Sequence, residues 1–165
     1  MAIQFVIYQD LDGCLCDFDG LSHTLFGEPF EPAKRVSLDR KIEVVQQTSG
    51  FWSRMPWMSD GRQLWSYVRQ HQPRILSAYA LWDYHSCLVG KREWIGHNLT
   101  IPSERIHLVN RPEKASFARS IKPNTVNVLI DDFDKNIAEW KAAGGHGIHH
   151  TSASSTISAL KALGL

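Results

Sequence analysis

Two aspartates separated by one residue follow the first apolar segment of the chain. Asp10 and Asp12 flank Leu11 and precede Gly13. A carboxylate beside a metal ion can attack phosphorus and form an acyl phosphate, and a second carboxylate can act as general acid and then as general base. Gly13 allows the backbone to turn close to a ligand without a crowding Cβ. An ordinary turn is the alternative interpretation of the same residues.

Further polar residues follow two later apolar segments. Ser77 ends the segment 74–77, and Asp131 with Asp132 follows the segment 126–130. Four carboxylates in one crevice of low dielectric would repel one another, so we expect a divalent cation to hold them together. Hard oxygen ligands of this kind suit Mg²⁺ best. A helix cap is the alternative role for the later aspartate pair.

A phosphoryl transfer also needs a cation to neutralise the charge that builds up on the transferring group. Lys91 and Lys114 are the candidates, and both are expected near the starts of helices in the second half of the chain. The Ser77 hydroxyl is expected to hold a phosphoryl oxygen. The residues considered so far therefore indicate chemistry on a phosphate ester, provided that the fold brings them together.

The elements that must position these residues alternate regularly after residue 60. Alternation of this kind predicts a parallel β-sheet with helices on both faces, a three-layer Rossmann-like α/β fold. Ligands of such sheets lie beyond the carboxyl ends of the strands, where the polar residues are expected to converge. Strands are predicted over 3–8, 74–77, 105–109, 126–130 and 147–150. Helices are predicted over 60–71, 91–99 and 154–163. Two further helices are predicted, one that begins at about residue 110 and one that follows Asp132 and ends at Gly144.

The segment 14–60 interrupts this alternation. It lacks a clear strand, so we expect a mainly helical and loop-like insertion, with 1–13 and 61–165 forming the core domain. Its aromatic residues suit stacking on a nucleobase, and a hydrophobic hinge between insertion and core is an equally weighted alternative. These aromatic residues are Phe51, Trp52 and Trp57. Trp65, Trp94 and Trp140 lie on apolar faces of predicted helices and are expected in the core, whereas Trp82 has no assigned role.

Composition excludes several classes of protein. The 165 residues include 18 Lys and Arg and 17 Asp and Glu, so a net charge of +1 argues against long nucleic acid or a membrane surface as partner. No stretch approaches the ~18 apolar residues of a membrane span, and the first eight residues lack a signal-peptide pattern. Three cysteines do not suggest a disulfide scaffold, so we expect a reducing cytoplasm. The oligomeric state stays open, a homodimer included.

Four ordered motifs carry a resemblance to a known family. Residues 8–18, Tyr-Gln-Asp-Leu-Asp-Gly-Cys-Leu-Cys-Asp-Phe, resemble the first motif of the haloacid dehalogenase-like (HAD) phosphatases. Within that superfamily the segment is most similar to the 5'(3')-deoxyribonucleotidases. Residues 75–78, 91–94 and 129–132 resemble the second, third and fourth motifs, in the same order along the chain.

The resemblance implies a role for each matching residue. Asp10 would be the nucleophile and a metal ligand, and Asp12 would be the acid/base, with its backbone carbonyl also on Mg²⁺. Ser77 and Lys91 would hold the phosphate. Asp132 would be the main metal ligand of the fourth motif, supported by Asp131.

The resemblance also implies a substrate class. The insertion would be the family's small cap, with Phe18 against a base and Lys114 as a secondary phosphate or structural residue. Ala78 stands where the nucleotidases often carry a second hydroxyl, so one phosphate contact is missing. The implied function is Mg²⁺-dependent hydrolysis of phosphomonoesters, with (deoxy)nucleoside monophosphates as substrates. A phosphatase for another small phosphomonoester and a non-catalytic phosphate- or metal-binding module are the alternatives.

Overall fold

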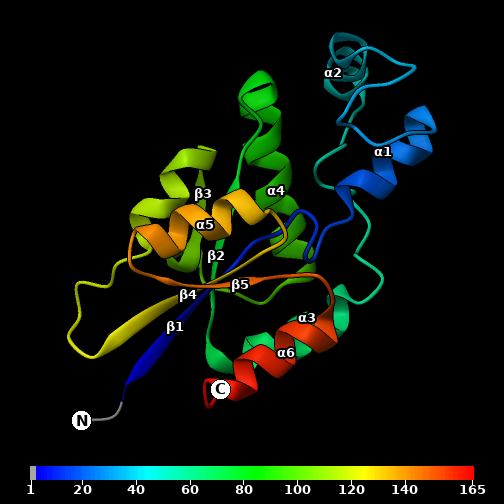
Figure 1. Cartoon of the computed structure of the whole chain (residues 1–165). Helices are drawn as coiled ribbons and strands as arrows, with labels where there is room; N and C mark the ends of the chain where they lie inside the picture. The colour runs from blue at the N-terminus through cyan, green and yellow to red at the C-terminus, as the bar shows by residue number, and fades with distance from the viewer. Residues whose placement is uncertain (1–2) are drawn as a thin grey trace.

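A five-stranded parallel sheet forms the centre of the molecule and confirms the expected α/β architecture (Figure 1). The computed structural model describes residues 3–165, so residues 1 and 2 of the expected core domain lie outside the described range. The strand order is β3-β2-β1-β4-β5, and every neighbouring pair is parallel. The strands are β1 (Gln4–Gln9), β2 (Arg74–Ala78), β3 (Ile106–Val109), β4 (Thr125–Asp131) and β5 (His146–His149).

Six α-helices and four short 3₁₀ helices complete the fold of residues 3–165. The α-helices are α1 (Phe18–Phe26), α2 (Leu38–Gln47), α3 (Gly61–Val68), α4 (Tyr84–Asn98), α5 (Asp134–Ala142) and α6 (Ala153–Ala162). The 3₁₀ helices are η1 (Arg69–His71), η2 (Leu81–Asp83), η3 (Ser103–Arg105) and η4 (Arg111–Phe117).

One expectation about helices requires correction. Helix α4 begins at Tyr84, so Lys91 lies in its middle and not near its start. The first turns of α4 were missed because the residues that they bury, Cys87 and Gly90, are small and give little hydrophobic periodicity. The segment after Asn110 forms the 3₁₀ helix η4 with Lys114 as its fourth residue, so this lysine lies near a helix start as expected.

The strands bury alternate side chains on opposite faces, as a two-residue period requires. Ile7, Ile75 and Val128 pack in one cluster with residues of α3, α4 and α6. Their neighbours in sequence pack in a second cluster with Ala118, Ile137 and Trp140. Figure 1 shows α5 on one side of the sheet and α3 with α6 on the other. Trp65, Trp94 and Trp140 are all buried, which confirms their expected place in the core.

The insertion between β1 and α3 carries α1 and α2, in agreement with the helical and loop-like character expected for 14–60. Figure 1 shows both helices set apart from those that flank the sheet. The boundaries of the cap and core domains stay a prediction. Within residues 3–165, none of the helices combines the length and the apolarity that crossing a bilayer requires. The three cysteines are buried and free.

Helix α4 approaches the end of the insertion closely at Gly90, which yields a test of the fold. A Cβ on Gly90 would lie 2.5 Å from Trp52 Cβ and 3.1 Å from the Ser53 backbone nitrogen. Overpacking costs about 1–3 kcal/mol, so we expect Gly90→Ala to lower the free energy of unfolding by about that amount. Urea denaturation measures the change.

Gly96 provides the matched control, because it lies in the same helix and its Cβ would meet no atom within 4 Å. Gly96→Ala is expected to raise the free energy of unfolding by up to about 1 kcal/mol, since alanine is the better helix former. Similar effects of the two substitutions would contradict the close packing of α4 on residues 52 and 53.

Candidate active site

The candidate site lies at the carboxyl ends of β1 and β4, two neighbouring strands in the interior of the sheet. Strand β1 has β2 on one side and β4 on the other, and such a switch in strand order leaves a crevice at the strand ends. The Asp10 backbone N–H donates to the Ile130 carbonyl over 3.0 Å, so Asp10 extends the pairing of the two strands. The Leu11 carbonyl then accepts three backbone N–H groups, from residues 14, 15 and 16, which closes a tight loop.

Glycine is required at position 13 of this loop. Its φ of +74° lies in the left-handed region that side chains disfavour. A Cβ there would also lie 2.0 Å from Asp132 Oδ2. Gly13 therefore allows the aspartate that follows β4 to come directly against the loop that follows β1.

Lys91 contacts Asp12 and is almost fully buried. Its Nζ donates to Asp12 Oδ2 over 2.6 Å, to Ser77 Oγ over 3.1 Å and to the Ala78 carbonyl over 2.6 Å. Burial raises the pKa of the Asp12 carboxyl, although the Lys91 ammonium opposes the shift. Burial lowers the pKa of Lys91, but the Asp12 carboxylate outweighs it, so this pKa lies above its ordinary value. Three of the residues expected at the site are thus in direct contact.

Lys114 balances the other side of the crevice. Its Nζ lies 2.7 Å from Asp131 Oδ2 and 3.0 Å from Asp10 Oδ1, and both contacts are buried. Burial opposes the charge on this lysine, but the two carboxylates outweigh burial and hold its pKa well above the ordinary value. The lysine that sequence reasoning placed second therefore contacts the expected nucleophile.

Both carboxylate oxygens of Asp131 accept hydrogen bonds from protein donors. Besides Lys114, its oxygens accept from the Phe133 backbone N–H over 2.9 Å and from the Asn136 amide over 3.2 and 3.0 Å. These contacts fix the start of α5 and the position of the Lys114 ammonium. The structure thereby gives Asp131 a supporting role through its neighbours, and its direct contact with a metal stays a prediction.

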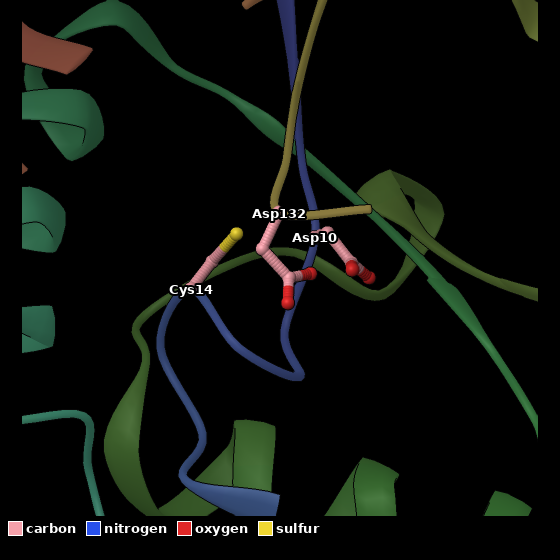
Figure 2. A group of neighbouring side chains, drawn as sticks. All are labelled: Asp10, Cys14 and Asp132. Atoms are coloured by element: carbon pink, nitrogen blue, oxygen red, sulfur yellow. The ribbon is translucent and has the colours of Figure 1, made fainter. Parts of the chain in front are cut away.

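Asp10, Cys14 and Asp132 each offer a ligand atom, and these atoms lie within 4.8 Å of one another (Figure 2). Figure 2 shows the two carboxylates side by side at the ends of β1 and β4. Asp12 Oδ1 is buried and has no hydrogen-bond partner among the described residues, and the buried Asp10 Oδ1 contacts the Lys114 ammonium at 3.0 Å. Buried carboxylate oxygens with a single donor or none are what a hard cation would satisfy, so these residues fit Mg²⁺.

The Cys14 thiol does not change this assignment. Burial, together with the carboxylates of Asp10 and Asp132, raises its pKa well above the ordinary value. The thiol is therefore neutral at pH 7, and only the thiolate is a strong metal ligand. Cys14 packs as a small apolar side chain at the edge of a carboxylate site.

A cavity of about 370 Å³, here called the aromatic cavity, opens beside Asp12 and Lys91. Its volume falls in the range of about 300–1,000 Å³ that is usual for sites of small ligands. A second cavity of about 370 Å³ holds Asp10, Lys114 and Asp132. Four residues line both cavities, namely Asp12, Phe18, Asp19 and Ala78. The walls of the aromatic cavity include Phe18, Phe30, Trp52, Tyr79 and Trp82.

The expected substrate contacts divide into two groups. Phe18, Trp52 and Ala78 line the aromatic cavity, and Lys114 lines the second one. Phe51 lies behind this wall, where it packs edge-on against Phe18 and Trp52.

The expectation for Trp57 requires correction. Its ring lies 5.0 Å from the Trp94 ring and its Nε1 donates to Asn98 Oδ1 over 2.9 Å. It lines a separate depression on the surface with Arg62 and Trp65. Proximity in sequence to Trp52 was misleading because the chain turns away from the cavity between these two residues.

Sequence reasoning missed several residues that line the two cavities. Phe30 and Trp82 stack at 5.4 Å with an interplanar angle of 12°, although one belongs to the insertion and the other to η2. Arg111 lines the second cavity and donates to Asn136 Oδ1 over 3.0 Å. Phe30 lies between two prolines and Trp82 follows no periodic pattern, so no local signal could have identified either. Asp19 and Glu31 also line the aromatic cavity.

Comparison with solved structures gives a likeness over nearly the whole chain. A hydrolase from Streptococcus pneumoniae TIGR4 has a TM-score of 0.50 and 15% identity, with 98% of this chain and 100% of that chain covered. A protein described as a haloacid dehalogenase-like hydrolase, from Burkholderia xenovorans LB400, has a TM-score of 0.49 and 14% identity over 88% and 80% of the two chains. No family model and no curated protein matches the sequence.

These likenesses concern the fold. At 15% identity, the first neighbour shows that this arrangement of strands and helices also occurs in a hydrolase, and the second lies below the TM-score at which an argument can rest on it. The expected fold class is confirmed. What the chain does must be argued from its own side chains.

The carboxylate cluster predicts a pH-dependent affinity for Mg²⁺. Partial burial and the charges of Asp10 and Asp131 raise the pKa of Asp132 to about 7. Below that pH the metal-free protein holds a proton on Asp132, and a metal ion must displace it. We expect the affinity to fall by up to about tenfold per pH unit below pH 7, with a proton released on binding. Calorimetry in two buffers of different ionisation enthalpy measures both.

The Asp132→Asn variant is the control for this measurement. It removes the titrating carboxylate, so both the proton release near pH 7 and most of the affinity are expected to disappear. An affinity that stays constant between about pH 6 and pH 8 in the unmodified protein, without proton release, would contradict the assignment.

Proposed function

We propose that this chain is a Mg²⁺-dependent phosphomonoester hydrolase of the HAD type, acting through an aspartyl-phosphate on (deoxy)nucleoside monophosphates. One observation carries the proposal. Asp10 and Asp12 lie just beyond the carboxyl end of β1, and each carboxylate has a buried lysine ammonium within 3.0 Å, Lys114 at Asp10 and Lys91 at Asp12. A nucleophile, an acid/base and charge-neutralising groups are thereby gathered in one crevice.

The first half-reaction uses the two aspartates in different protonation states. An Asp10 carboxylate oxygen attacks phosphorus, and the bond from phosphorus to the leaving oxygen breaks. Asp12 donates a proton to that oxygen, so the alcohol leaves neutral. The raised pKa of Asp12 favours the protonated form that this step needs. Lys91 lies against Asp12 and Ser77, where its charge offsets charge on the phosphoryl oxygens.

The second half-reaction reverses the role of Asp12. Its carboxylate takes a proton from water, the water oxygen attacks phosphorus, and the bond between phosphorus and the Asp10 oxygen breaks. Phosphate leaves and both carboxyl groups return to their starting states. Mg²⁺, when bound, neutralises the carboxylates and polarises the phosphoryl group. Asp10, Asp132 and the Asp12 carbonyl are the groups that would hold it.

The aromatic cavity supports a nucleoside as leaving group. It opens beside Asp12, the proposed proton donor, so a leaving alcohol would extend into it. Phe18 and Trp82 are both half-buried, and their rings offer surface to a planar base. Stacking of a base on an aromatic side chain is worth about 1–3 kcal/mol.

Substitution of the nucleophile tests the mechanism. Asp10→Asn removes the attacking oxygen charge, so we expect the rate of Mg²⁺-dependent phosphate release to fall by at least about a thousandfold. Asp39→Asn, an exposed aspartate in the first turn of α2, serves as the matched control. Circular dichroism verifies that both variants fold. Retained Mg²⁺-dependent turnover in Asp10→Asn would sink the covalent mechanism.

A substrate panel tests the proposed specificity. We expect kcat/KM for nucleoside monophosphates to exceed that for sugar phosphates by at least about tenfold, the equivalent of one stacking interaction of about 1.4 kcal/mol. Phe18→Ala and Trp82→Ala should narrow this ratio, whereas Leu81→Ala, 67% exposed in η2, should not. A ratio near one in the unmodified enzyme would favour another small phosphomonoester as substrate.

A further inference from the structure

The aromatic cavity has an unbalanced charge. Five ionisable side chains line it, namely the carboxyl groups of Asp12, Asp19 and Glu31, the ammonium of Lys91 and the phenol of Tyr79, which is neutral at pH 7. Lys91 contacts three acceptors, Asp12 Oδ2, Ser77 Oγ and the Ala78 carbonyl, which together use its three N–H donors. The only cation of the cavity wall within residues 3–165 is therefore fully engaged at its floor.

Asp19 and Glu31 are the two charges left over. Both are exposed, and neither forms an ion pair or a side-chain hydrogen bond with another described residue. Asp19 lies in the first turn of α1, where a helix N-terminus alone would favour a carboxylate. That explanation does not extend to Glu31, which lies in the loop after Phe30. The mouth of the cavity thus carries two negative charges with no cation to balance them.

A buried ion pair holds Glu31 at this mouth. The Glu28 carboxylate accepts the backbone N–H groups of residues 34, 35 and 36, at 2.9–3.2 Å. It also lies 2.8 Å from Nζ of Lys41, a side chain with no exposed area. Lys41 in turn donates to the carbonyls of Pro29 and Phe30 over 2.6 and 3.0 Å. Both flanks of the loop that carries Glu31 are therefore tied to α2.

The wall beside Glu31 is held from the core side as well. The Phe30 ring stacks on Trp82, and the Gln46 amide of α2 donates to the Trp82 carbonyl over 2.5 Å. Consequently Glu31 stays next to the space that a leaving group would enter. Because the backbone at Glu31 is held in place, its carboxylate remains within reach of a group that enters this space, where it would repel a second anion.

We propose that Asp19 and Glu31 form an acidic rim that restricts this enzyme to phosphomonoesters whose leaving group carries no negative charge. The inference rests on the proposed phosphatase function and adds the charge of the leaving group to it. The phosphoryl group itself is handled in the second cavity, beside Asp10 and Lys114 and where Asp10 and Asp132 would hold Mg²⁺. Asp19 lines both cavities, whereas Glu31 lines the aromatic cavity. A second anionic group on the substrate would lie in the aromatic cavity, where no cation is free.

Two aryl phosphates that differ in one carboxylate test the rim without involving a nucleobase. Phenyl phosphate and 4-carboxyphenyl phosphate are assayed with Mg²⁺, and the readout is the ratio of their kcat/KM values. We expect the unmodified enzyme to favour phenyl phosphate by at least about tenfold. Raising the salt from about 0.01 M to about 1 M shortens the Debye length from about 30 Å to about 3 Å and should narrow the ratio.

Neutral variants then assign the effect to the two residues. The double variant Asp19→Asn with Glu31→Gln should lower the ratio to about threefold or less and remove most of its salt dependence. Glu31→Lys should lower it further, since it places a cation at the rim. The ratio between two substrates is informative because a general disturbance of the site acts on both. Asp39→Asn, which lies outside the cavity, is the control and should keep the ratio of the unmodified enzyme.

The outcomes separate this inference from the proposed function. Equal kcat/KM values for the two aryl phosphates in the unmodified enzyme, or one unchanged ratio across all variants, would overturn the rim and leave the phosphatase function intact. Absence of turnover with both aryl phosphates and with nucleoside monophosphates would overturn the proposed function, and the rim with it.

Discussion

Negative charge concentrated at the carboxyl ends of β1 and β4 is the constraint on which the rest of this structure depends. Asp10 and Asp131 are nearly inaccessible to solvent, and Asp12 and Asp132 lie beside them. Buried like charges are costly unless cations offset them. Lys91 pairs with Asp12 and Lys114 with Asp10, and carboxylate oxygens with a single donor or none suit a metal ion. The loop after β1, with Gly13, and the helices α4 and η4, which carry the two lysines, position these charges.

The insertion between β1 and α3 also contains a buried charge that needs a partner. A fully buried Lys41 would be strongly destabilising alone, and its partner Glu28 is nearly as buried. Lys41 and three backbone amides hold the pKa of Glu28 well below its ordinary value, so the carboxylate is charged at neutral pH. One buried ion pair thus orders a loop without regular secondary structure and places Phe30 and Glu31 beside the cavity. The insertion thus relies on the pair of Lys41 with Glu28, as the core relies on the pairs of Lys114 with Asp10 and Asp131.

Much of the core could be predicted because its signals are local. The β-branched run before Asp10 and the run before Asp131 are both short apolar strands, and the sheet that follows from their alternation with helices is observed. The early turns of α4 were missed because Cys87 and Gly90 bury little apolar surface. The wall of the aromatic cavity was predicted only in part. Phe30 and Trp82 are distant in sequence, and their stacking exists only after the insertion folds back on η2.

The sequence by itself determined the class of fold and the chemical types present at the ends of β1 and β4. Residue type and spacing were sufficient there, because the aspartates lie at the carboxyl ends of β1 and β4 or within three residues of them, and parallel strands end at one edge. Only the tertiary structure decided which lysine meets which carboxylate, with Lys91 on Asp12 and Lys114 on Asp10 and Asp131. It also excluded Trp57 from the cavity and brought Glu31 to its mouth. These outcomes depend on how separate segments pack against one another, and no local pattern encodes that packing.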